Sequence, residues 1–347
     1  MEYVSAGASG LMVSRLVFGN ALTHGDQIDD ETARDCVHTA LDLGITTFDT
    51  ADVYADGRAE EVLGRILGGR LRSELVLCSK VGRSKRPDPN AGRLSRKHIF
   101  DSVHGSLRRL GTGYLDLYQA HRFDDRTPLE ETLRAFADLV RGGEIRYVGV
   151  SEWSAAQLRA AAGPARDLGV PLVSNQPQYS ILWRVIEAEV IPACDELGIG
   201  QLVWSPLAGG VLTGKYRPGG PLPPDSRAAT RGGARSIGRW HYLGEDVLDV
   251  VGRLAPLAES AGLSLAQLAL AWVLKNPSVT SAIVGASRPA QLRENLKALD
   301  TVLDDDLYAR VNETADPVVR RDPALTEDPL GPAPARSGAP AAASAAR

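Results

Sequence analysis

The 347 residues are 44% hydrophobic and 24% charged, and their formal net charge is −4. This balance is typical of a soluble globular protein, and the weak negative charge argues against a nucleic-acid-binding protein, which usually carries a basic face. No apolar run approaches the roughly 20 residues that span a bilayer. The first residues have neither the basic region nor the apolar region of a signal peptide, so we expect a cytoplasmic protein without a membrane partner.

Three cysteines, Cys36, Cys78 and Cys194, lie far apart in apolar segments. Their odd number and wide spacing predict reduced, buried thiols, not disulfides or metal ligands. We therefore expect no metal site.

Short apolar runs alternate with longer helical patterns along most of the chain. The predicted strands are residues 17–21, 46–51, 75–80, 115–121, 145–150, 172–176, 201–205 and 281–285. The predicted helices are residues 30–43, 59–67, 95–110, 128–141, 154–169, 187–197, 247–261, 264–275 and 289–299. Capping boxes mark two helix starts, one with Thr127 and Glu130 around Pro128, the other with Ser154 and Gln157.

The strand-like runs are continuously apolar, which indicates a parallel sheet with both faces covered by helices. Eight strand–helix units favour an α/β fold of the closed (β/α)8 type, the TIM barrel, over an open doubly wound sheet. The open sheet would normally show a GxGxxG motif after its first strand, and this chain has none there. Residues 2–4 and 12–14 flank a glycine-containing turn, which predicts an N-terminal β-hairpin at the bottom of the barrel.

Two segments fall outside the eightfold pattern. The loop at about 209–243, after the seventh strand, is long enough that we expect it to fold over a ligand. The tail is rich in Pro and Ala. We therefore predict one barrel domain over residues 1–317 and a disordered tail over residues 318–347.

Four reactive side chains are predicted at one end of this barrel. Asp49, Lys80 and His121 stand at the C-terminal ends of the second, third and fourth strands, and Tyr54 follows the second strand closely. Active sites of such barrels form at that end. Taken singly, Asp49 could cap a turn, Lys80 could be a surface lysine, His121 a core histidine and Tyr54 an ordinary loop residue. Together, the four favour a proton-transfer site.

The chemistry that these groups suit is the reduction of a carbonyl, which needs a proton donor for the developing oxyanion. Tyrosine, with a pKa of about 10, donates reluctantly at neutral pH. An adjacent Lys80 cation would favour the phenolate, and Asp49 would balance the charge of Lys80. His121 would hydrogen-bond the substrate oxygen and direct it.

These residues resemble the aldo-keto reductase family over residues 3–317. The match rests on Asp49 through Tyr54, on Ser79-Lys80 and on Gln119-Ala120-His121-Arg122. The branch that includes the β subunits of voltage-gated potassium channels looks closest, because of residues 94–99, 204–208, 212–216 and 286–296. The resemblance implies that those channel subunits lack the histidine that this chain keeps as His121, which favours an active reductase.

The resemblance further implies NADPH bound in an extended form. Ser151, Asn175 and Gln176 would hold the nicotinamide carboxamide, whereas Glu152 stands where the branch commonly has Asn or Arg. The other cofactor residues would be Gly19, Asn20, Asp49, Trp204, Ser205, Pro206, Leu207, Gly209, Lys215, Arg227, Gly285, Ser287, Gln291, Glu294 and Asn295. Gln291 replaces a common arginine, so Ser287 with Arg288 or Arg227 is left to hold the 2′-phosphate that distinguishes NADPH from NADH.

Substrate recognition would fall to rim residues, among them aromatic side chains that suit a flat or apolar carbonyl compound or a sugar. They are Asn20, Trp153, Tyr179, Trp183 and Trp240, with the loop around Arg239. Two rival functions stay open: a regulatory subunit that senses the nicotinamide ratio, and a dedicated keto-sugar reductase in a biosynthetic pathway. The channel-like branch forms tetramers, so a homo-oligomer also stays open.

Overall fold

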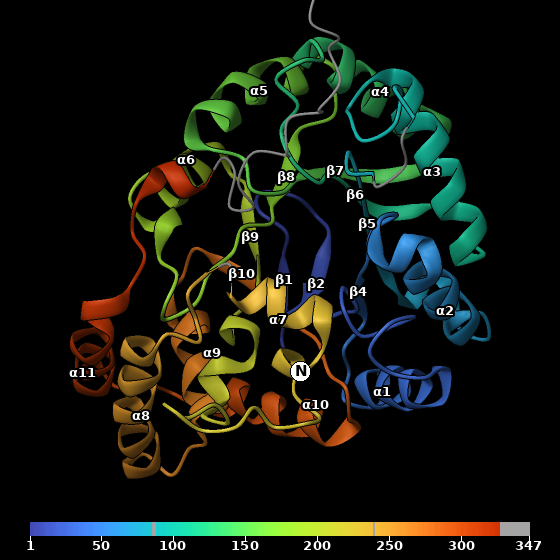
Figure 1. Ribbon diagram of the computed structural model, residues 1–347. Helices are drawn as coiled ribbons and strands as arrows, with labels where there is room; N and C mark the ends of the chain where they lie inside the picture. The colour runs from blue at the N-terminus through green and yellow to red at the C-terminus, as the bar shows by residue number, and fades with distance from the viewer. Residues whose placement is uncertain (85–87, 239, 327–347) are drawn as a thin grey trace, which may run out of the picture.

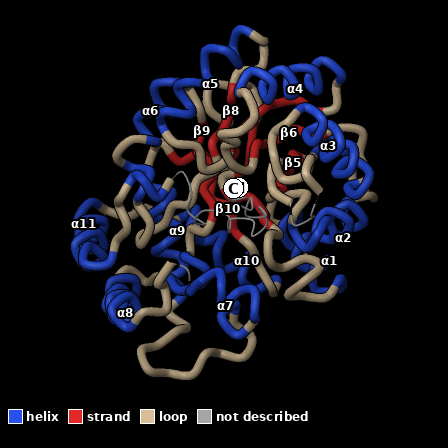
Figure 2. The backbone as a smooth tube through the Cα atoms, turned by 45° about the horizontal axis from the view of Figure 1, so that its top comes forward, coloured by secondary structure: helices blue, strands red, loops and turns tan. Residues whose placement is uncertain are grey.

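Eight parallel strands close on themselves because β10 pairs with both β3 and β9. The computed structural model describes residues 1–84, 88–238 and 240–326. Figure 1 shows helices around the strands, and Figure 2 looks more nearly along the barrel. The barrel strands are β3 (Leu16–Gly19), β4 (Thr47–Asp49), β5 (Val76–Val81), β6 (Leu115–Ala120), β7 (Ile145–Val150), β8 (Leu172–Asn175), β9 (Gly200–Trp204) and β10 (Val279–Val284). The predicted (β/α)8 barrel is confirmed.

Most of the helices pack apolar side chains on the outside of the barrel, which explains why the strands are apolar on both faces. The helices are α1 (Asp30–Asp42), α2 (Arg58–Leu67), α3 (Arg96–Leu110), α4 (Leu129–Gly142), α5 (Ala155–Asp167), α6 (Val190–Leu197), α7 (Arg231–Gly238), α8 (Glu245–Ser260), α9 (Leu265–Lys275), α10 (Pro289–Leu296) and α11 (Asp305–Ala315). Across the described ranges, no single helix has the length and apolar composition to cross a membrane. Only α8 and α9 together meet that criterion, and they are bent by 87°.

One of the two predicted capping boxes is present. Ser154 and Gln157 cap α5 reciprocally, as expected. The box predicted at Thr127 is wrong: α4 begins after Pro128, which acts as the N-cap without a side-chain hydrogen bond. The Thr127 hydroxyl donates instead to the Asp124 carboxylate at 2.5 Å. The Thr127 hydroxyl therefore forms its hydrogen bond with Asp124 and does not cap the helix.

The N-terminal hairpin fills the bottom of the barrel. Its strands are β1 (Tyr3–Ser5) and β2 (Met12–Ser14). Apolar side chains of the hairpin join the inner barrel core, which consists of Ala6, Leu11, Val13, Val17, Cys78, Leu117, Val173, Leu202 and Ile283. Gly7 has φ +57°, and a Cβ there would collide with the backbone of Gly198 and Gly200. The hairpin turn therefore presses on the N-terminal ends of the strands, as predicted.

The ordered chain extends past the predicted domain boundary at 317. The backbone of Arg320 hydrogen-bonds with Leu182 and Arg184, and the side chain of Thr326 is buried. Residues 327–347, the rest of the predicted tail, lie outside the described residues, as does Arg239. The three cysteines are free and buried, as expected.

The long segment after β9 contains more regular structure than its sequence predicted. It includes a 3₁₀ turn over Ala208–Thr213, a second over Arg227–Ala229, and helix α7. Figure 1 shows α7 in yellow, close to the middle of the molecule. The glycines within the segment hid this helix, because they lower helix propensity.

Candidate active site

A cavity of about 1140 Å³ opens at the C-terminal end of the barrel strands. Residues at or just beyond the ends of most barrel strands line it, so the reactive groups converge although they are far apart in sequence. The predicted site residues that line it are Gly19, Asp49, Tyr54, His121, Ser151, Gln176, Trp204, Ser205, Pro206, Leu207, Gly209, Lys215, Arg227, Trp240, Gly285, Ser287, Gln291, Glu294 and Asn295.

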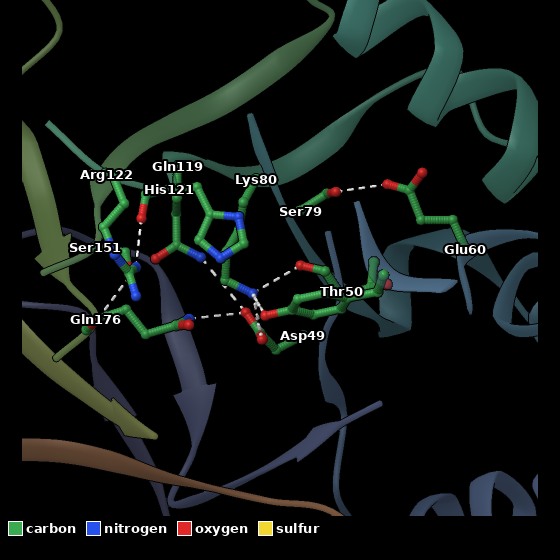
Figure 3. A network of polar contacts seen from close by, with 11 residues as sticks. Asp49, Thr50, Glu60, Ser79, Lys80, Gln119, His121, Arg122, Ser151 and Gln176 are labelled. Carbon is green, nitrogen blue, oxygen red and sulfur yellow. Dashed lines mark hydrogen bonds and ion pairs between the residues drawn. The ribbon is translucent and has the colours of Figure 1, made fainter. Parts of the chain in front are cut away.

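Lys80 lies beneath the cavity and joins two of these groups. Its Nζ donates to Asp49 Oδ2 at 2.6 Å, to the Thr50 carbonyl at 2.8 Å and to Tyr54 Oη at 3.1 Å. Figure 3 shows Lys80 pointing at Asp49 and Thr50. The side chain is fully buried, so its cation depends on these oxygens for compensation. The structure therefore brings together the amine, the carboxylate and the phenol that the sequence predicted.

The charge state of Lys80 follows from its neighbours. Burial opposes the cation, but the Asp49 carboxylate and the Tyr54 oxygen outweigh this and raise the pKa of Lys80 above its ordinary value. The second Asp49 oxygen accepts from Gln176 Nε2 at 2.8 Å. Asp49 is thus held on both sides, by Lys80 and by Gln176, as Figure 3 shows. Lys80 Nζ also reaches Tyr54 Oη.

His121 stands beside Tyr54, with ring centroids 5.8 Å apart and the rings nearly perpendicular. Burial lowers the pKa of His121 well below its ordinary value, and the charges of Arg122, Lys80 and Arg83 act in the same direction. The imidazole is therefore neutral at physiological pH and can donate one hydrogen bond. Its Nδ1 is buried without a hydrogen-bond partner among the described residues.

The three residues expected to hold a carboxamide lie together, but they differ in their access to the cavity. Ser151 Oγ donates to the Gln176 carbonyl at 2.9 Å, and both residues line the cavity. Asn175 is fully buried and does not line the cavity, yet neither of its amide atoms has a hydrogen-bond partner within the described chain. An unpaired buried amide is costly, and this one lies next to two polar residues that do line the cavity. The cluster therefore suits a ligand amide at the cavity wall.

The segment after β9 offers a site for an anion. Gly209 and Gly210 have φ values of +68° and +94°, and a Cβ on Gly210 would lie 3.1 Å from Lys215 Nζ. Burial and the charge of Arg227 lower the pKa of Lys215, and burial lowers the pKa of Arg227. Neither cation forms an ion pair with an acid of the described chain. Two crowded, partly desolvated cations fit a pyrophosphate.

At the far end of the cavity, the polar groups are already engaged with one another. Gln291 Oε1 accepts from the Ser287 backbone N–H at 2.8 Å, and Glu294 Oε1 accepts from Gln267 Nε2 at 2.7 Å. Arg288 pairs with Asp225 at 2.9 Å, which links the start of α10 to the long segment after β9. This ion pair is exposed on both sides.

Besides Asn175, four other predicted binding residues do not line the cavity. Asn20 donates its amide N–H to the Ala59 carbonyl, and the other three pack elsewhere. Trp153 packs edge-on against Phe123, Tyr179 donates its hydroxyl to Glu187, and Trp183 packs on Trp240. In each case, the local backbone turns the side chain into packing around the site. Of the four aromatic residues predicted for substrate recognition, Trp240 lines the cavity, whereas Trp153, Tyr179 and Trp183 do not.

Several lining residues were not predicted. They lie on loops that follow barrel strands, or in the long segment: Thr23, Asp26, Gln27, Arg83, Arg122, Ile237 and Tyr242. Their position on such loops was the available signal, because loops at this end of a barrel surround the site. Arg122 directly follows His121 and donates to Ser151 Oγ at 3.3 Å.

A second buried network lies behind the site, between the sheet and helices α2 and α3. Glu60 is fully buried, accepts from Ser79 Oγ at 2.6 Å and pairs with Arg109 at 2.7 Å. Asp52, two residues before Tyr54, donates its backbone N–H to the Lys80 carbonyl. Burial, together with the Glu60 charge, raises the pKa of Asp52 to about 7.

We expect Asp52→Asn to raise the free energy of unfolding at pH 8 by on the order of 2–4 kcal/mol. The lower end of this range allows for screening by solvent. The folded-state pKa of Asp52 is raised, so the wild type loses stability as pH rises from about 4 to about 7, whereas the amide does not ionise. Urea denaturation at pH 8 and pH 5 should show the gap narrowing at the lower pH. Asp249→Asn, an exposed control on α8, should change stability little; an equal gap at both pH values would contradict the reasoning.

The model of the "Aldo/keto reductase family" matches residues 15–316. A protein of Arabidopsis thaliana named "Probable voltage-gated potassium channel subunit beta" is 45% identical over 308 residues, covering 87% of this chain and 92% of the relative. A protein of the same name from Oryza sativa subsp. japonica is 43% identical, covering 94% and 99%.

A relative from Schizosaccharomyces pombe, also named for a voltage-gated potassium channel β subunit, is 41% identical over 316 residues, 88% of this chain and 91% of the relative. Both the barrel and the predicted resemblance agree with the family match. The chain therefore belongs to the aldo/keto reductase family.

Proposed function

We propose that this protein reduces an aldehyde or ketone to an alcohol with NADPH, and that Tyr54 is the proton donor. The observation that carries the proposal is the position of Lys80 Nζ, within hydrogen-bonding distance of both Asp49 and Tyr54 Oη beside the cavity. A small-molecule carbonyl compound in the cytoplasm is the substrate class that we propose.

Each residue of the site has a separate role in this reaction. The bound reduced nicotinamide would supply a hydride to the carbonyl carbon. Tyr54 Oη passes a proton to the carbonyl oxygen, and the nearby Lys80 cation stabilises the phenolate left behind. Asp49 keeps Lys80 charged and in place. Neutral His121 donates a hydrogen bond that orients the substrate oxygen.

For the cofactor, we assign Ser151, Asn175 and Gln176 to the carboxamide, and Lys215 with Arg227 to the pyrophosphate. The unpaired amide of Asn175 and the two crowded cations support this assignment. Ser287, Gln291, Glu294 and Asn295 would hold the adenosine half. Arg288 would pair with a 2′-phosphate by leaving Asp225, and this supports NADPH over NADH.

Arg227→Ala should weaken NADPH binding by about 10–100-fold, because a hydrogen bond to a charged group contributes about 1.5–3 kcal/mol. Quenching of tryptophan fluorescence during titration with NADPH and NADH measures this. Arg217→Ala removes an exposed cation from the same segment and should leave the affinity almost unchanged. Failure of the wild type to bind either nucleotide would overturn the proposed function itself.

The names of the relatives favour a second candidate, a regulatory subunit that senses the nicotinamide ratio and acts on a membrane channel. It predicts tight nucleotide binding with slow turnover, and co-purification with a membrane protein. Rapid turnover of a simple aldehyde by the purified protein, with no membrane protein co-purifying, would argue against it.

A further inference from the structure

Glu152 has an unusual backbone conformation directly after Ser151, at the end of β7. Its φ is +56°, a left-handed value that side chains other than glycine and asparagine seldom adopt. The side chain is 2% exposed, so a carboxylate has been placed in the interior beside the cavity. A strained backbone and a buried charge both cost stability. Such features persist where the surrounding structure holds them in place, and they cluster at functional sites.

The carboxylate serves two donors from different parts of the barrel. Its Oε1 accepts from the Gln178 backbone N–H at 2.6 Å and from Trp204 Nε1 at 2.7 Å. Trp204 ends β9 and lines the cavity. One oxygen therefore fixes the indole of a cavity wall to the end of β7.

The same oxygen also affects a second part of the cavity wall, because it holds Gln178. The Gln178 side-chain N–H donates to Tyr242 Oη at 2.8 Å, and Tyr242 lines the cavity from the long segment after β9. Because the Gln178 backbone is held by Glu152, the tyrosine position depends indirectly on the same acid. The ends of β7 and β9 and the long segment are thus joined at Glu152.

Opposing influences act on the charge of this acid. Burial raises the pKa of Glu152, while the Arg122 charge and the two N–H donors oppose the rise. Hydrogen bonds to an ionised acceptor are about twice as strong as neutral ones. A neutral side chain would hold the indole less firmly.

We propose that Glu152 is a positioning residue that holds Trp204, and through Gln178 also Tyr242, in the cavity wall against which ligands bind. This inference rests on the proposed function only for its effect on ligands.

A double-mutant cycle with Glu152→Asn and Trp204→Phe tests the tie. Asparagine tolerates the left-handed backbone but is too short to reach both donors, so it separates the hydrogen bonds from the strain. Phenylalanine keeps an aromatic wall without the N–H. We expect Glu152→Asn to raise the Kd for NADPH and the KM for a carbonyl substrate about tenfold, with kcat changed less than threefold.

In the Trp204→Phe background, the same change at Glu152 should have a much smaller effect, because the indole donor is gone. Melting temperatures of the four apoproteins provide a second readout: the combined loss should be smaller than the sum of the single losses. Strict additivity in both readouts, or wild-type behaviour of Glu152→Asn, would overturn the proposal. If Glu152→Asn fails to fold, Glu152→Gly takes its place in the cycle with the same criteria, because glycine also tolerates the left-handed backbone and has no side-chain acceptor.

Glu187→Gln is the matched control, because Glu187 accepts from Tyr179 and Arg184 outside the cavity. It should lower the melting temperature without altering the Kd for NADPH. If the wild type does not bind NADPH, the proposed function fails, while the coupling of melting temperatures still tests Glu152 independently.

Discussion

Replacing Tyr54 with phenylalanine should lower kcat by about 10²–10⁴-fold, the range for loss of a positioned proton donor. The substitution removes only Oη, which accepts from Lys80 Nζ, and leaves the ring beside His121. The rate of NADPH oxidation with a small aldehyde measures the loss, and the Kd for NADPH should change little.

Tyr114→Phe is a control of the same chemistry, because Tyr114 lies between Arg72 and Arg146, remote from the cavity lining. It should keep wild-type turnover. Unchanged turnover in Tyr54→Phe would remove the tyrosine as the proton donor and leave His121 as the next group to test.

Lys80→Met should cost about 3–5 kcal/mol of stability, as expected when one partner of a buried ion pair is removed. Asp49 would stay almost fully buried with its charge uncompensated, although Gln176 would still donate to it. Turnover should fall as well, because nothing would stabilise the Tyr54 phenolate. Urea denaturation and steady-state rates measure the two effects separately.

The double variant Asp49→Asn with Lys80→Met distinguishes folding from chemistry. It removes both charges, so most of the lost stability should return, whereas turnover should not. If the single and double variants unfold at the same urea concentration, the ion pair does not account for the stability, and Lys80 acts through its packing alone.

The barrel could be predicted because its signals are local: apolar strand runs, helical periodicity and glycine at the helix ends. The groups at the strand ends could also be placed, since parallel strands bring their C-terminal ends to one rim. The positions of Asp49, Lys80 and His121 at strand ends were enough to predict that they meet, without knowing where their side chains point. This is why distant residues were brought together correctly.

The direction of loop side chains could not be predicted. Trp153, Tyr179 and Trp183 follow strand ends as the catalytic residues do, yet they turn into packing, because backbone bends after the strand decide where each ring points. Glu152 shows the same dependence: its left-handed φ directs the carboxylate toward Trp204. Similarly, the hydroxyl of Thr127 went to Asp124 because a tertiary contact displaced the local cap.

The hairpin at the bottom of the barrel determines where the chain can be extended. Met1 leads directly into the hairpin that closes the face opposite the cavity, so a purification tag there stays clear of ligand entry. By contrast, Arg320, near the end of the described residues, pairs with Trp183, whose ring packs on cavity-lining Trp240. Immobilisation through the N-terminus therefore suits binding assays on this protein, because it presents the open mouth to solution.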